Sequence, residues 1–119
     1  MPFELWDVVD VPAFPNQEDK KETTARPAVI LEDLGREAMI CPVTSQTQQQ
    51  SRYSYTIFID KDSQEGKAMG FTFNSIIVLD RHEILSKLRL RPTGCSCPPT
   101  IADKLDAMME KMRQDGINI

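Results

Sequence analysis

The sequence lacks long hydrophobic runs and is poor in cysteine, histidine and aromatic residues. Its 119 residues include three cysteines, one histidine and 7% aromatics, and no apolar stretch exceeds a few residues. A membrane-spanning helix needs about 20 consecutive apolar residues, so we expect no membrane span. The N-terminus contains Glu4, Asp7 and Asp10 and no basic segment, which does not fit a secretory signal. We therefore expect a soluble, cytoplasmic protein.

The cysteine count argues against a disulfide framework or a zinc site. Cys41, Cys95 and Cys97 are odd in number and cannot all pair within one chain, which suits a reducing compartment. Cys95 and Cys97 are spaced closely enough to suggest a metal or redox site. However, the second pair of cysteines or histidines that makes a zinc site specific is missing. The pattern therefore favours Cys95 and Cys97 as ordinary small residues of a loop, and it predicts no metal ion.

The composition also lacks the basic excess that is typical of proteins that bind long nucleic acids. The net charge is −4, and the acidic excess lies in residues 1–60. One local exception is Lys87, Arg89 and Arg91, which alternate with leucines, so on a strand all three basic side chains would face one side. Such a stripe is either the solvated face of a half-buried strand or a patch that faces phosphate.

What the chain does contain is enough apolar residues for the core of one domain, residues 1–119. Leu, Ile, Val and Phe make up about a quarter of it, above the level at which disorder is expected. Short apolar or β-branched runs predict strands at residues 5–11, 27–31, 38–43, 55–59 and 75–79. Residues 84–90 suit a strand or a helix. Polar residues predict a long loop over 12–25 and a mobile loop over 44–54.

One helix is predicted clearly, after Pro98 and Pro99. Thr100 is expected to cap it, with Asp103 at the reciprocal capping position, and Gly116 to end it. Its apolar stripe has helical spacing and consists of Ile101, Leu105, Met108, Met109 and Met112. Short strands followed by one helix indicate a mainly β fold: a small antiparallel sheet or barrel with a C-terminal α-helix.

Two stretches resemble the PemK/MazF-type toxin ribonucleases. Residues 26–31 (RPAVIL) are similar to the "RPAVVL" second strand of that family, and residues 41–46 (CPVTSQ) to its "P-x-T-S" strand end. Weaker similarity occurs at residues 7–11, 74–79 and 87–90. The order and spacing of these motifs match the family over residues 5–115.

The resemblance implies an SH3-like antiparallel barrel and metal-free cleavage of single-stranded RNA, without a cofactor. It also implies a homodimer that an antitoxin protein silences. Carried over by position, Arg26 and Thr44 are the expected catalytic residues, with Ser45 and Gln46 as substrate-binding neighbours. An arginine can bind two phosphate oxygens and stabilise charge as the RNA 2′-hydroxyl attacks, and a threonine hydroxyl can donate a hydrogen bond to the phosphate.

Four more residues are expected to contact RNA. Tyr53, beside the Gln-rich segment, can stack on a base, as can Tyr55 unless it belongs to the core. Arg52 would add positive charge, and so would Lys87 and Arg89 from the second subunit of a dimer. His82 lies between charged residues, outside the matched motifs, and is expected to be a surface histidine rather than an acid–base catalyst.

Other functions remain open. Trp6 stands where the family usually has glycine, and Asn74 where aspartate is common. These departures allow a catalytically silent or gyrase-directed relative that acts as a protein-binding module. A third possibility is an adaptor barrel that recruits a protein through its Met-rich helix.

Overall fold

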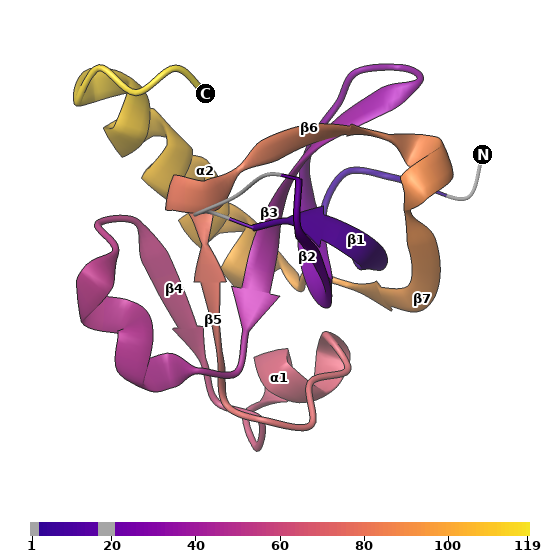
Figure 1. Ribbon diagram of the computed structural model, residues 1–119. Helices are drawn as coiled ribbons and strands as arrows, with labels where there is room; N and C mark the ends of the chain where they lie inside the picture. Colours follow the sequence, from indigo (N-terminus) through magenta and orange to yellow (C-terminus); the bar gives the residue numbers. More distant parts are fainter. Residues whose placement is uncertain (1–2, 17–20) are drawn as a thin grey trace.

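The computed structural model describes residues 3–16 and 21–119, in which short strands precede a C-terminal helix (Figure 1). The strands are β1 (Asp7–Pro15), β2 (Thr23–Asp33), β3 (Glu37–Thr44), β4 (Thr56–Ile59), β5 (Ser75–Val78), β6 (Glu83–Ser86) and β7 (Arg91–Ser96). The α-helices are α1 (Gln64–Ala68) and α2 (Pro99–Gln114). Three 3₁₀ turns complete the order: η1 (Thr47–Arg52), η2 (Leu79–Arg81) and η3 (Lys87–Arg89).

The strands form one antiparallel sheet with β3 at its centre. Their order is β4-β5-β3-β2-β1-β7, and β6 also pairs with β3. Since β2 occupies one edge of β3, β6 and β5 follow one another along the other edge. The mainly antiparallel β fold with a C-terminal helix is thus confirmed. In the described chain the edge strands β4 and β7 do not pair with one another, so the sheet is curled but does not close into the expected barrel.

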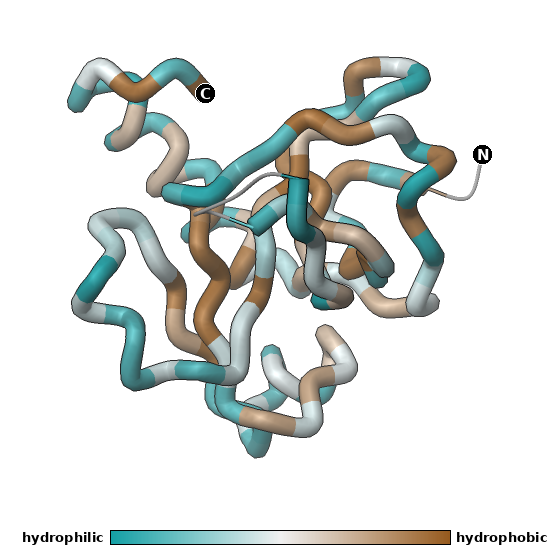
Figure 2. The backbone as a smooth tube through the Cα atoms, viewed as in Figure 1, coloured by the Kyte–Doolittle hydropathy of each residue, from teal (hydrophilic) through white to brown (hydrophobic). Residues whose placement is uncertain are grey.

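The central strands are buried on both faces. Val29 and Leu31 of β2 belong to the apolar cluster that includes the buried face of α2, whereas Ala28 and Ile30 belong to a second cluster. This two-sided burial is what the continuous apolar run at residues 28–31 predicts. Figure 2 shows hydrophobic residues concentrated along β3 and β5. The rigid centre of the sheet therefore holds the strand ends that carry the candidate site.

Helix α2 packs on the sheet through the predicted stripe. Ile101, Leu105, Met109 and Met112 are buried, and α2 ends before Gly116, which has a positive φ of 86°. The predicted cap is wrong: Pro98 is the N-cap, without a side-chain hydrogen bond, and Pro99 takes the first helical position, which suits proline. The Thr100 hydroxyl instead donates to Glu65 Oε1 at 3.4 Å. No helix in the described residues is long and apolar enough to cross a membrane.

The predicted loop over residues 12–25 is wrong at both ends. Strand β1 continues through Pro12 to Pro15, and β2 begins at Thr23, because Phe14 is fully buried in the second cluster and holds the two strands together. A shift of register between Val11 and Phe14 accommodates Pro12, which has no N–H to donate. The middle of this predicted loop, residues 17–20, lies outside the described residues.

The predicted basic stripe is also wrong. Lys87 and Arg89 belong to the 3₁₀ turn η3 rather than to a strand, and Arg91 begins β7. The Lys87 ammonium is buried and donates to Asp33 at 2.6 Å, while Arg89 is exposed. The alternation would place the three side chains on one side of a strand, but across η3 and the start of β7 each has a different partner: Asp33 for Lys87, the Ala13 carbonyl for Arg89, and the Leu88 and Leu90 carbonyls for Arg91.

Trp6 carries the one positive φ among the described non-glycine residues, 71°. This left-handed region favours glycine, which is the residue that the resemblance predicts at this position. The indole packs against the larger apolar cluster, which offsets part of the backbone strain. The chain thus keeps the backbone turn before β1 with a different residue.

Candidate functional site

Arg26 and Thr44 lie side by side at the ends of neighbouring strands. The register of β2 and β3 places Ala28 opposite Pro42. Two residues closer to the start of β2 and to the end of β3, the same register places Arg26 opposite Thr44. Opposed residues share a face of the sheet. Both line the same two cavities. The structure therefore brings together the two residues that the sequence analysis selected as catalytic.

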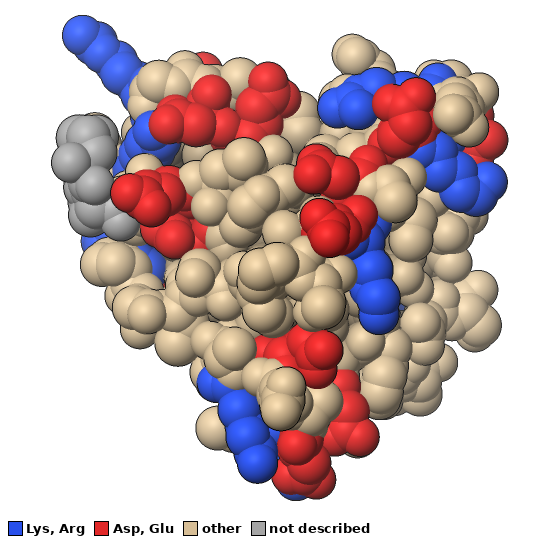
Figure 3. All heavy atoms as spheres, turned by 180° about the vertical axis from the view of Figure 1, so that it is seen from behind, with Lys and Arg blue, Asp and Glu red and all other residues tan. Residues whose placement is uncertain are grey.

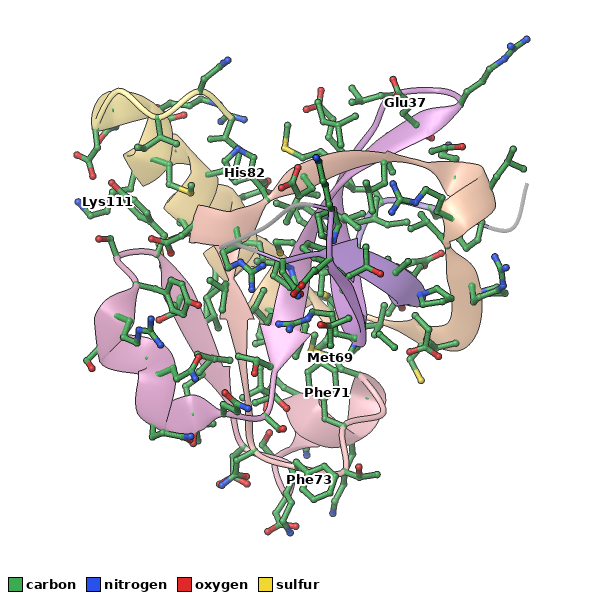
Figure 4. The ribbon with its side chains drawn as sticks, viewed as in Figure 1. Glu37, Met69, Phe71, Phe73, His82 and Lys111 are labelled. Carbon is green, nitrogen blue, oxygen red and sulfur yellow. The ribbon has the colours of Figure 1, made fainter. Side chains whose placement is uncertain are left out.

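The larger cavity, of about 530 Å³, lies near the start of β2 and the end of β3, beside the connection from α1 to β5. Ser45 and Gln46 line it beside Thr44, so the predicted neighbours of the site are also assembled. Its opposite side is aromatic, formed by Phe71 and Phe73. Figure 4 shows these two residues, with Met69, along that connection. The cavity thus combines a polar side that suits a phosphate with an apolar side that suits a base.

Phe71 and Phe73 were missed by the sequence reasoning. Phe73 is 67% exposed, unusual for a phenylalanine, and Phe71 is half-buried. The signal in the sequence was an aromatic pair, Phe-Thr-Phe, inside a polar and charged connection where no core strand was predicted. An exposed aromatic residue beside a cationic group is a common binding feature for single-stranded nucleic acids.

The smaller cavity, of about 100 Å³, shares Arg26, Thr44 and Gln46 with the larger one. It is further lined by Tyr53 and Arg81. Tyr53 was a predicted stacking residue, and the structure brings it to the site. Tyr55 is not at the site: it packs against the core, and its hydroxyl donates to Asp115 Oδ2 at 2.7 Å.

The Arg26 guanidinium is held in an environment that disfavours its charge. Burial, and then the positive charge of Arg81, lower the pKa of Arg26, and Tyr53 raises it by a smaller amount. Its Nε atom is buried and has no hydrogen-bond partner in the described part of the chain. Arginine stays protonated in proteins, so this is a cation with one buried donor unsatisfied. An anion in the cavity would stabilise its charge.

Thr44 presents a hydroxyl group with a defined orientation. Its Oγ1 accepts a hydrogen bond from the backbone N–H of Gln46 at 3.1 Å. Since that bond uses an oxygen lone pair, the hydroxyl proton remains available to donate. The side chain is half-buried at the cavity edge. Arg26 and Thr44 therefore offer a charged and a neutral donor to the same space.

The lining carries little negative charge. Among the residues that line the larger cavity, Asp10 is the one carboxylate, and the smaller cavity has none. Elsewhere charges are mixed: the face in Figure 3 shows acidic and basic side chains interspersed, without a broad basic patch. The smaller cavity, with Arg26 and Arg81, is thus positively charged even though the chain as a whole is acidic.

Three of the predicted RNA-binding residues are not brought to these cavities. Arg52 is exposed at the end of η1 and lines neither cavity. Lys87 is engaged by Asp33, and an Nη of Arg89 donates to the carbonyl oxygen of Ala13 at 2.7 Å. Lys87 and Arg89 line neither cavity. Within one subunit Lys87 and Arg89 thus do not reach these cavities, and their expected contact with RNA from a second subunit stays a prediction.

His82 lies away from the cavities. Its Nδ1 is 2.9 Å from the carbonyl oxygen of Leu79, and its Nε2 is 3.3 Å from that of Asn118. Figure 4 places it at the start of β6, beside α2. The imidazole therefore contacts backbone carbonyl groups near the C-terminus, a structural role.

The cysteines differ in exposure. Cys41 and Cys97 are buried, and burial raises the pKa of both thiols, that of Cys97 to about 12. Cys95 is half-buried and lines the larger cavity. The described residues contain no group of three or more His, Cys, Asp or Glu side chains arranged to hold a metal ion.

Fold and site together define a small antiparallel β protein with an arginine–threonine pair in a cavity suited to a phosphate. The chain belongs to the family described as PemK-like, MazF-like toxin of type II toxin-antitoxin system, whose pattern matches residues 4–112. A search of curated proteins gave no match. The family match covers every strand and most of α2, so both Arg26 and Thr44 lie inside it.

Proposed function

We propose that this protein is a metal-independent endoribonuclease, the toxin of a toxin-antitoxin pair, that cleaves single-stranded RNA in the cytoplasm. The observation that carries the proposal is the Arg26 guanidinium, part-buried and with an unsatisfied Nε, beside the oriented Thr44 hydroxyl. Two such donors suit a phosphate that gains negative charge during cleavage. Membership of a toxin family makes RNA cleavage the function that fits this geometry best.

In the proposed reaction the 2′-hydroxyl oxygen of the substrate attacks the adjacent phosphorus. A new P–O2′ bond forms, the P–O5′ bond breaks, and the products carry a 2′,3′-cyclic phosphate and a 5′-hydroxyl. The 2′ proton passes to water, and water returns a proton to the leaving 5′ oxygen. Arg26 binds the non-bridging oxygens and Thr44 donates to one of them, which lowers the barrier by an amount on the order of 3–4 kcal/mol per donor.

The remaining lining residues fit a single-stranded substrate. Phe71 and Phe73 offer ring faces to a base next to the cleaved phosphate, and Tyr53 offers a third. Ser45 and Gln46 provide polar groups for base edges or sugar hydroxyls. Stacking of this kind is worth about 1–3 kcal/mol per base, so it suits a protein without a broad basic surface.

We also propose an antitoxin that covers this cavity and a symmetric homodimer. Leu88 is 88% exposed on η3, and Phe58 and Ile84 are each about half exposed on β4 and β6. Exposed apolar side chains beside open strand edges are the kind of surface that a second copy covers. Sedimentation equilibrium at micromolar concentration is expected to give a dimer, and a stable monomer would contradict it.

The proposed chemistry can be tested on the ends of the products. We expect the purified protein to release fragments with 2′,3′-cyclic phosphate and 5′-hydroxyl ends, at an unchanged rate in EDTA. A single 2′-deoxy substitution at the cleaved nucleotide should abolish cleavage. Loss of activity in EDTA, or cleavage of the deoxy-substituted strand, would overturn the mechanism. A protein that neither binds nor cleaves RNA would instead indicate the silent, protein-binding relative.

A further inference from the structure

Arg81 lines the same small cavity as Arg26, although no motif in the sequence singles it out. It ends η2, the three-residue turn that separates β5 from β6 along the edge of β3. The registers show this interruption: Val43 pairs with Ile77, whereas Ile40 pairs with Glu83. The three extra residues between these pairings form the turn that brings Arg81 to the cavity.

Two contacts fix the position of the Arg81 guanidinium. Its Nη2 donates to the carbonyl oxygen of Pro15 at 3.0 Å, and its Cζ lies 5.9 Å from the ring centroid of Phe14, which is fully buried. A cation over an aromatic ring is held by the negative face of the ring. Only one of the five N–H donors of the guanidinium is used by Pro15, so others remain for a ligand.

The two arginines are close enough for their charges to repel. Arg81 contributes to the lowered pKa of Arg26, second only to burial. In the described parts of the chain, no carboxylate lies within 4.0 Å of either guanidinium in an ion pair. Two part-buried cations close together, with no ion-paired carboxylate among the described residues, cost free energy in the empty protein. An anion between them would remove that cost.

We propose that Arg81 is a second phosphate-binding residue, which together with Arg26 holds one phosphate of a single-stranded RNA backbone at the smaller cavity. The inference rests on the proposed function and identifies a further residue in it. The cavity, of about 100 Å³, suits a phosphate group better than a base. Thr44 and Tyr53 complete the lining with hydroxyl groups.

Arg81→Gln tests the inference, with Arg113→Gln as a matched control. Both arginines donate to a backbone carbonyl oxygen, Arg81 to Pro15 and Arg113 to Ile119, but Arg113 lines no part of the site. The probe is a single-stranded RNA in which a 2′-deoxy nucleotide blocks cleavage. We expect Arg81→Gln to weaken binding about tenfold or more and to reduce the salt slope by about 0.7, the value for one lost phosphate contact. The control should leave both unchanged.

RNA with one uncharged backbone linkage distinguishes phosphate binding by Arg81 from a structural role. In a scan of RNAs that each carry a single methylphosphonate, the substitution at one linkage should weaken binding to the wild-type protein but not to Arg81→Gln. The thermal unfolding midpoints of both variants check the fold, and Arg81→Lys, which keeps the charge, should bind between wild type and Arg81→Gln.

The outcomes separate this inference from the proposed function. If wild-type protein binds and cleaves RNA while Arg81→Gln keeps wild-type affinity, salt slope and methylphosphonate response, the role of Arg81 is wrong and the proposed function stands. If wild-type protein neither binds nor cleaves RNA, both are wrong.

Discussion

Replacing Thr44 by valine tests the role of one hydroxyl group with little change of shape. Valine has nearly the same volume, so the contacts of the half-buried side chain are kept. Two interactions are removed: the hydrogen bond that Oγ1 accepts from the Gln46 N–H at 3.1 Å, and the donor proposed for the substrate phosphate. The first loss affects the free energy of unfolding and the second affects the rate of cleavage, so each effect can be estimated and measured separately.

The effect on stability is expected to be small. A typical intramolecular hydrogen bond contributes about 1 kcal/mol, and the Gln46 N–H is exposed enough for water to replace its partner. The effect on catalysis is expected to be larger. Removing one donor to a developing oxyanion costs about a hundredfold or more in rate, roughly 3 kcal/mol. Thr44→Val should therefore lose far more activity than stability.

The assay is single-turnover cleavage of a single-stranded RNA, with urea unfolding of the same preparations. Thr44→Ser keeps the hydroxyl and serves as the matched control, and we expect its rate to stay within about fourfold of wild type, because one methyl group contributes only about 0.8 kcal/mol. If Thr44→Val cleaves as fast as Thr44→Ser, the hydroxyl does not contact the reacting phosphate and this part of the account fails.

Three further predictions concern the fold and the cavity. Leu105→Ala should lower the free energy of unfolding by about 2–5 kcal/mol, measured in urea, because Leu105 is fully buried on the inner face of α2; a loss below about 1 kcal/mol would contradict the packing. An alkylating reagent should modify Cys95 in the cavity but not buried Cys97, whose thiol pKa is about 12, and should block cleavage; mass spectrometry after brief labelling checks this. Tyr55→Phe should reduce stability near neutral pH and less at both extremes. The hydrogen bond lowers the pKa of Asp115, so the stability that the bond contributes is lost as pH falls below 3.8. The bond also raises the pKa of Tyr55, so the same contribution is lost as pH rises above 10.0. An equal difference in stability between variant and wild type at every pH would refute the pairing.

Local patterns predicted the centre of the fold well. The continuous apolar run at residues 28–31 indicated burial on both faces, and the stripe on residues 101–112 indicated one face of a helix; both are confirmed. The short connection between β2 and β3 contains Gly35, which has a φ of 85°. These features depend on neighbours within a few residues, which the sequence displays directly.

Features that depend on distant partners could not be predicted. Strand β1 continues past Pro12 because Phe14 is buried in an apolar cluster. Most members of that cluster are far from Phe14 in the sequence. The sequence pattern suggested that Lys87 is an exposed basic residue, but Lys87 forms an ion pair with Asp33, 54 positions away. Arg81 reaches the cavity only because η2 interrupts the pairing along β3. The motif residues Arg26 and Thr44 were recognisable, whereas the residues that surround them come from other segments.

The rate of RNA cleavage by Arg26→Ala tests the central claim most directly. Arg36, exposed next to the Gly35 turn and remote from both cavities, provides the matched control for loss of one arginine. We expect Arg26→Ala to lower the single-turnover rate by about a hundredfold or more while it keeps the wild-type unfolding transition, and Arg36→Ala to cleave at the wild-type rate. If Arg26→Ala cleaves as fast as Arg36→Ala, the Arg26–Thr44 cavity is not where this protein acts on RNA.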